Sequence, residues 1–293
     1  MQSGDFENLK SEFISGYYSK GYSKQAKILM DAGNKAYSYL IDFFQKKPQI
    51  ELFVLDGDDW EKLKLPQKYE HGPFFISYNT LYKVYYPSNV PKFWRNGLFT
   101  LCNAAPQELK DEFLSTIKYE DRDFKSSFLQ NFDLNLFSLT IVHEFTHVFC
   151  ETNHIIPQIV SDSVFYSLDL AWFTEFFCQY AFYSFLKKNF DEYAKNWFLI
   201  GKLCYEGGKP LVRYTDLQHF GEHYKDIVMM SGGTNLFWYQ FGKFMLMAEE
   251  LCRKYGENFL KKTIDKMEYK EEKFVNTLQQ SLPNFQSWFQ KWK

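Results

Sequence analysis

The chain has 293 residues, a formal net charge of −2 at pH 7 and a pI near 6.3, which argue against the basic footprint of a nucleic-acid-binding protein. Charged residues make up 24% of the chain, near the usual share for globular domains, so long disordered segments are not expected. Aromatic residues reach 20%, with 32 Phe and 21 Tyr, and this predicts a large aromatic core in one domain or two lobes.

The beginning of the chain predicts no targeting segment. Residues 1–13 are polar and include acids, without the apolar region of a signal peptide. No apolar run reaches the roughly 18 residues that a membrane-spanning helix needs. The five cysteines are odd in number and widely spaced, and no C-x-x-C pair occurs. We therefore expect free thiols and a cytoplasmic protein, while export by a route without a cleavable signal stays open.

The first part of the chain predicts a helix followed by a small sheet. Residues 5–47 carry apolar side chains mostly at helical spacing and end at a Lys-Lys-Pro stop. Four strand-like runs follow, broken by Asn, Pro and Gly: residues 49–55, 73–79, 81–87 and 97–104. Residues 106–130 become helical and charged, so we place the boundary between two lobes at residue 130, within a window of about 105–135.

The second lobe, residues 131–293, begins with a helix that carries the run His143-Glu144-Phe145-Thr146-His147. This is an H-E-x-x-H motif, and residues four apart on a helix share one face, so His143 and His147 can bind one metal ion. Glu144 lies beside them, where it can take a proton from a metal-bound water. The alternative is a core helix whose two histidines are satisfied by hydrogen bonds. That arrangement would leave the Glu144 carboxylate ionised and unpaired, at a high cost in free energy.

A second apolar helix is expected from about Ser167 to Lys188, and Glu175 is the only acid between Asp169 and Asp191. A carboxylate in such surroundings needs a cation or a metal as its partner. Hydrolytic zinc sites take three protein ligands and leave a fourth position for water. His143, His147 and Glu175 would form such a set; the alternative for Glu175 is a solvated position on an irregular helix.

The rest of the chain predicts further helices and one misleading motif. His219 to His223 reads H-x-x-E-H, the inverted zincin order, but Gly221 weakens a helix there and the flanks are polar. We interpret these histidines as a surface pair, one of which is a candidate to line a cleft. A third apolar helix is expected at residues 234–255, and the amphipathic tail from residue 257 is expected to dock back on the core.

These motifs together resemble those of gluzincin metallopeptidases, in which H-E-x-x-H is followed by a helix resembling W-x-x-E-G-x-A-x-Y. Residues 172–180 keep the Trp, the Glu and the Tyr of that pattern but depart from it at Phe176 and Cys178, where small residues are usual. The segment Tyr239-Gln240-Phe241-Gly242 is similar at Tyr and Gly to the Y-E-K-G segment of the aminopeptidase N branch. No G-x-M-E-N segment precedes His143, which favours an endopeptidase over an aminopeptidase.

The resemblance implies an α+β, zincin-like (thermolysin-like) fold: a small N-terminal mixed sheet with helices, then a mostly helical lobe, with the active-site cleft between them. It implies one Zn²⁺ per chain on His143, His147 and Glu175, with Glu144 as the general base and Tyr239 as a donor to the oxyanion. A peptide or protein substrate would pair with a strand, for which Leu98–Ala105 is our candidate.

Two alternatives to a general zinc endopeptidase stay open: an inert peptide-binding module on the same fold, and a protease effector or toxin with one protein target. The sequence does not give the substrate or the oligomeric state.

Overall fold

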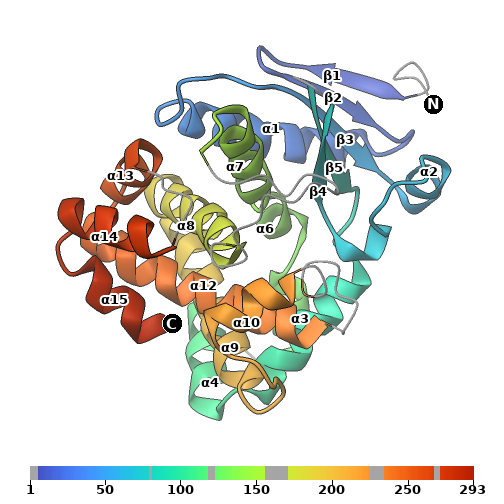
Figure 1. Cartoon of the computed structure of the whole chain (residues 1–293). Helices are drawn as coiled ribbons and strands as arrows, with labels where there is room; N and C mark the ends of the chain where they lie inside the picture. The colour runs from blue at the N-terminus through green and yellow to red at the C-terminus, as the bar shows by residue number, and fades with distance from the viewer. Residues whose placement is uncertain are drawn as a thin grey trace. The chain divides into compact units, whose positions relative to one another are not determined.

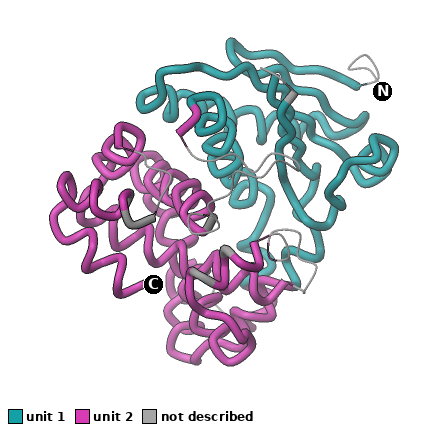
Figure 2. Tube along the Cα trace, viewed as in Figure 1, with its two compact units in different colours: residues 1–96, 128–153 teal, residues 97–127, 154–293 magenta. Residues whose placement is uncertain are grey.

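The computed structural model describes residues 6–78, 81–117, 123–155, 171–224, 227, 234–266 and 271–293. They form an α+β fold with a small mixed sheet and a mostly helical C-terminal part (Figure 1). The chain divides into two compact units, unit 1 at residues 1–96 and 128–153 and unit 2 at residues 97–127 and 154–293 (Figure 2). The H-E-x-x-H motif thus falls in unit 1 with the sheet, whereas the boundary expected at residue 130 grouped it with the later helices.

Unit 1 carries all five described strands. Its elements are β1 (Glu7–Lys10), β2 (Ile14–Tyr18), α1 (Ser23–Leu40), β3 (Gln49–Leu55), α2 (Gly57–Lys62), the short 3-10 helix η2 (Tyr69–His71), β4 (Phe74–Tyr78), β5 (Leu81–Pro87), α6 (Leu134–Ser138) and α7 (Ile141–Thr152). Two helices cross the boundary between the units, α3 (Lys92–Ala104) and α5 (Phe124–Asn131).

The sheet has the order β1-β2-β3-β5-β4. Strands β2, β3 and β5 are parallel, and β1 and β4 are antiparallel outer strands. Phe53 of β3 and Tyr85 of β5 are register partners that stack at 5.1 Å on one face, where Trp60 of α2 packs against them. The neighbouring Tyr86 points to the opposite face, because successive side chains alternate, and its hydroxyl donates to the carbonyl of Phe137 in α6 over 3.3 Å.

Two expected elements in the first part of the chain are wrong. Residues 7–10 and 14–18 are strands rather than helix, and β2 buries every second residue, the period of a strand. Residues 97–104 lie in helix α3 rather than in a strand. Leu98, Leu101, Cys102 and Ala105 are all buried, and their spacing of three, four and seven is helical. A short apolar run without alternation fits either state.

Unit 2 consists of helices in the described part of the chain. Besides most of α3, these are α4 (Gln107–Thr116), α8 (Ala171–Asn189), α9 (Asp191–Gly208), α10 (Leu217–Glu222), α12 (Thr234–Tyr255), α13 (Asn258–Lys266), α14 (Glu271–Ser281) and α15 (Phe285–Trp292). The helix expected at residues 234–255 is confirmed as α12. The one expected from Ser167 is confirmed from Ala171 onward, and its earlier residues lie outside the described part.

The C-terminal tail packs back on unit 2, as predicted. Phe289 of α15 stacks on Trp172 of α8 with ring centroids 5.5 Å apart, and Trp288 lies 5.6 Å from Phe176. All five cysteines are free thiols and four of them are buried, which confirms that prediction. None of the described helices combines the length and apolar character needed to cross a membrane.

Helices α9 and α12 pack closely because each presents a glycine to the other. A Cβ atom added at Gly242 of α12 would lie 2.4 Å from the carbonyl oxygen of Gly201 in α9 and 2.7 Å from the nitrogen of Tyr205. Both contacts are to backbone atoms, which cannot rotate away. The close packing of α9 and α12 therefore explains why position 242, the glycine shared with the Y-E-K-G segment, has no side chain.

We predict that Gly242→Ala lowers the free energy of unfolding by about 1–3 kcal/mol, the usual cost of overpacking, despite the higher helix propensity of Ala. Urea unfolding followed by circular dichroism measures this change. The matched control is Gly57→Ala in the first turn of α2, where an added Cβ meets nothing within 4 Å. Equal stability of the two variants would show that α9 and α12 are not in close contact at Gly242.

Candidate metal centre

Helix α7 is held in unit 1 by one apolar side. Its buried residues include Ile141, Val142, Phe145, Val148 and Phe149. Helix α1 approaches this side closely at Gly33, where a Cβ atom would lie 3.3 Å from the Ile141 side chain and 3.4 Å from that of Phe145. The other side of α7 carries the half-buried residues His143, Glu144 and His147, so packing fixes the helix while its polar stripe stays accessible.

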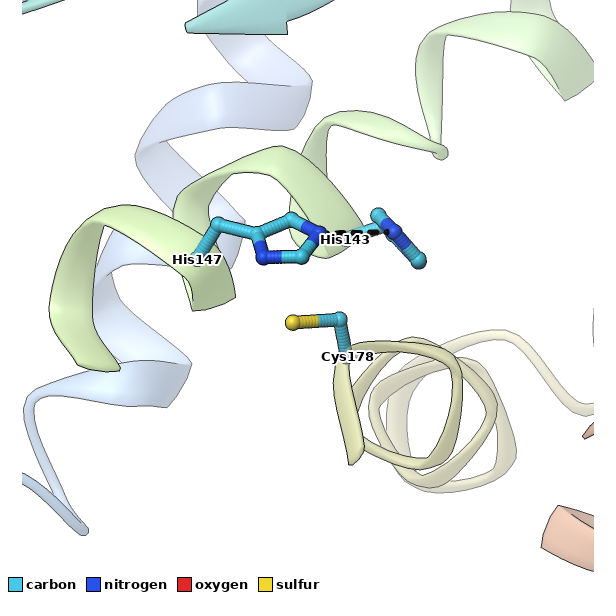
Figure 3. A group of neighbouring side chains, drawn as sticks. All are labelled: His143, His147 and Cys178. Carbon is cyan, nitrogen blue, oxygen red and sulfur yellow. Dashed lines mark hydrogen bonds between the residues drawn. The ribbon is translucent and has the colours of Figure 1, made fainter. Parts of the chain in front are cut away.

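The two histidines place their Nε2 atoms 3.1 Å apart, with ring centroids 4.8 Å apart and ring planes inclined by 66° (Figure 3). In a tetrahedral zinc site each imidazole nitrogen lies about 2.0–2.1 Å from the ion, which sets two such nitrogens roughly 3.3–3.4 Å apart. The observed separation is close to that value. The pair therefore fits two ligand positions of one zinc ion without a change of helix geometry.

Two aromatic residues of unit 1 lie near the polar side or the beginning of α7. The ring of Phe75, in the outer strand β4, stacks on His147 with centroids 5.8 Å apart and 21° between the planes. Burial raises the pKa of the Tyr86 phenol well above its usual value, and the nearby Glu144 carboxylate raises it further. Tyr86 also hydrogen-bonds Thr140, the residue before α7. Tyr86 is thus a neutral donor that anchors the beginning of the motif helix.

Glu175 and Cys178 lie one turn apart on α8 in unit 2. Glu175 is half-buried between fully buried neighbours, and its Oε1 atom accepts a hydrogen bond of 2.7 Å from the hydroxyl of Tyr224. Cys178 is completely buried. Figure 3 draws Cys178 with His143 and His147 as a group whose side chains could each offer one atom to a metal ion. Among the described residues, the predicted ligand Glu175 is not part of this group.

Tyr239 lies in α12 and is only 2% exposed. Its ring stacks on Tyr205 of α9, with centroids 5.3 Å apart, and presses against Gly208, where a Cβ would lie 2.8 Å from the tyrosine ring. Burial raises the pKa of the Tyr239 phenol, and the adjacent Tyr205 adds to the effect. This is the placement of a core tyrosine, and its role as an oxyanion donor stays a prediction.

The H-x-x-E-H histidines pair with other groups. His219 shares a hydrogen bond of 2.6 Å with Asp216 through Nδ1, and the ring of Tyr214 stacks on both His219 and His223. Over the described residues, no set of three potential metal ligands includes either of these histidines. Their arrangement is that of a partly exposed aromatic stack.

Sequence reasoning missed three groups near the candidate ligands. Tyr224 lies between two polar stretches, and its pairing with Glu175 joins positions 49 residues apart, which no local pattern reveals. Phe75 was read only as a strand residue. Cys178 was noted only as a departure from a family pattern, although its spacing of three from Glu175 places both on one face of α8.

Comparison of the chain with known protein families, characterised proteins and solved structures found no match. The case for a function therefore depends on the residues themselves.

We predict that the purified chain binds one Zn²⁺ and that His147→Ala weakens this binding by more than the 10–100-fold typical of losing an outer-shell partner, because it removes a direct ligand. Glu175→Ala should also weaken it. Isothermal titration with Zn²⁺ measures both effects. His223→Ala is the matched control, since it removes an imidazole from the H-x-x-E-H segment and should leave the affinity unchanged. Equal losses in His147→Ala and His223→Ala would contradict a site on α7.

Proposed function

We propose that the chain is a zinc-dependent metallopeptidase of the gluzincin type that hydrolyses peptide bonds as an endopeptidase. The observation that carries this proposal is the 3.1 Å separation of the His143 and His147 Nε2 atoms, with Glu144 next to them on the accessible side of α7. Two imidazoles at ligand spacing with an adjacent carboxylate are the combination that metal-assisted hydrolysis uses.

We assign the third ligand to Glu175. A carboxylate suits a hydrolytic zinc site of the His₂Glu kind, and ligating carboxylates are characteristically held by a further hydrogen bond, as Tyr224 holds Glu175. Cys178 is the second candidate for the same position, because thiolates also bind zinc and because it shares a face of α8 with Glu175. The buried position of Cys178 favours its role as a small apolar neighbour.

In the proposed reaction, each of the three polar motif residues on α7 has one role. Zinc, when bound, lowers the pKa of a coordinated water to about 7 and polarises the substrate carbonyl. Glu144 accepts the proton of the attacking water and later passes it to the leaving amine. His143 and His147 supply neutral nitrogen ligands, and the stacking of Phe75 on His147 fixes the plane of that ring.

The outer strand β4 replaces residues 98–105 as the candidate for binding an extended substrate, because residues 98–104 belong to helix α3. Strand β4 pairs with β5 on one side and is the last strand of the sheet. It also carries Phe75, the neighbour of His147. A peptide added alongside β4 would gain main-chain hydrogen bonds, which give affinity with little preference for side chains, and would need no free terminus.

We predict that Glu144→Gln lowers the rate of peptide cleavage by about 10²–10⁴-fold, the usual contribution of a general base, while zinc affinity is retained. Mass spectrometry of a digested peptide library, with and without chelator, measures cleavage and its position in the peptide. Glu222→Gln, at the acid of the H-x-x-E-H segment, should cleave like the wild type.

Cleavage by Glu144→Gln at the wild-type rate would contradict the proposed role of Glu144. If the wild-type chain binds zinc but cleaves no peptide, the inert peptide-binding module replaces the peptidase.

A further inference from the structure

Two of the five cysteines lie against each other inside unit 2. The Sγ atom of Cys102, in the part of α3 that belongs to this unit, is 3.7 Å from the Sγ atom of Cys204 in α9. Both side chains are completely buried. The two residues are 102 positions apart in the sequence, so the contact between their sulfur atoms is a product of the fold.

The cysteines lie where α3 and α9 approach each other backbone to backbone. A Cβ atom added at Gly207, one turn after Cys204, would collide with the carbonyl oxygen of Leu101. The same atom would lie 2.9 Å from the backbone nitrogen of Ala105. Because backbone atoms cannot rotate away, this glycine keeps the two turns that carry the cysteines within side-chain reach of each other.

This pair of thiols does not complete a metal site. A structural zinc ion takes four protein ligands, and over the described residues no group of three potential ligands includes Cys102 or Cys204. Burial raises the pKa of the Cys102 thiol well above its usual value, and the adjacent Cys204 raises it further. The protonated thiol is a poor metal ligand, whereas two thiols in contact can still be oxidised together to a disulfide.

We propose that Cys102 and Cys204 form an oxidation site at which a peroxide closes a disulfide between α3 and α9. First, the sulfur of one cysteine attacks hydrogen peroxide. An S–O bond forms, the O–O bond breaks, and the departing hydroxide takes up the proton that the thiol released, giving water and a sulfenic acid. The sulfur of the other cysteine then attacks the sulfenic acid, an S–S bond forms, the S–O bond breaks and a second water leaves. Two thiols are oxidised and one peroxide is reduced to two waters.

Closure of the bond requires little movement. An S–S bond is about 2.05 Å long, so the two sulfur atoms must approach by about 1.7 Å. The second thiol is already in contact with the first, so it can trap the sulfenic acid before another peroxide or another chain reaches it. The cross-link would join residues 102 positions apart, and a link over so long a segment restricts the unfolded chain and stabilises the folded one.

The chain itself contains a comparison that separates proximity from exposure. Cys252 in α12 is partly exposed, whereas the other four cysteines are buried. If exposure alone decided the product, oxidation would be concentrated at Cys252 and any cross-link would contain it. If the contact of the sulfur atoms decides the product, the cross-link within one chain joins Cys102 to Cys204.

The test treats the folded full-length chain with hydrogen peroxide, blocks the remaining thiols with N-ethylmaleimide, and analyses a digest by mass spectrometry without reduction. We expect the linked peptides of Cys102 and Cys204 to be the dominant cross-link and to separate when dithiothreitol is added. Cys204→Ala should remove this link, and Cys252→Ala should retain it. Cross-links that mostly contain Cys252, or separate sulfinic acids at Cys102 and Cys204, would overturn the inference. Absence of the link at a peroxide concentration that oxidises Cys252 would overturn it as well.

Thermal unfolding gives a second readout on the same samples. The midpoint of the oxidised wild type should lie several degrees above that of the reduced protein, and peroxide should produce no such rise in Cys204→Ala. An unchanged midpoint in fully linked protein would overturn the stabilising role of the disulfide. None of these measurements requires zinc or peptide cleavage, so the inference is tested separately from the proposed function.

Discussion

The pairing of two imidazoles on one face of α7 is the constraint on which the proposed function depends. An i, i+4 spacing brings side chains to the same face of any helix, but it does not by itself bring two ring nitrogens to 3.1 Å. That separation also requires side-chain rotamers that turn both rings toward one point, and the place of that point in the fold depends on how α7 is fixed. In unit 1 the fixing comes from apolar packing on α1, with Gly33 allowing the close approach, and from Tyr86, which bonds the residues just before α7.

Unit 2 holds a carboxylate inside an aromatic helical core, which requires a hydrogen-bond donor close to it. Helix α8 is surrounded by rings, and Glu175 is the acid within it. Tyr224 supplies a donor to that acid, and Phe220 and Phe244 support the donor. The hydrogen bond from Tyr224 offsets part of the cost of removing this carboxylate from water.

The helices with long apolar periods could be predicted from the sequence. Short strands, and contacts between residues far apart in the sequence, could not. Helices α7, α8 and α12 follow from residues that repeat at helical spacing over three turns or more. Strands β1 and β2, of 4 and 5 residues, were missed because residues 5–47 were interpreted as one mostly helical stretch. Residues 97–104 were assigned to a strand because an apolar run of that length fits both states.

Some residues of the candidate site could be predicted from the sequence, and others could not. His143, Glu144 and His147 follow from one motif, and Glu175 from the cost of a lone acid in an apolar helix. Tyr224 could not be predicted, because only the fold joins α10 and the residues after it to α8. The membership of α7 in unit 1 could not be predicted either. The described elements before and after it, α6 and α8, are helical, and only three-dimensional packing groups it with the sheet.

The most direct test of the central claim is X-ray absorption spectroscopy at the zinc edge on the zinc-loaded full chain. The proposed site predicts two imidazole nitrogens at about 2.0–2.1 Å together with oxygen ligands at similar distance. A sulfur ligand at about 2.3 Å would transfer the third position from Glu175 to Cys178. A spectrum with no imidazole contribution would contradict zinc binding by His143 and His147, and with it the account of this protein as a zinc peptidase.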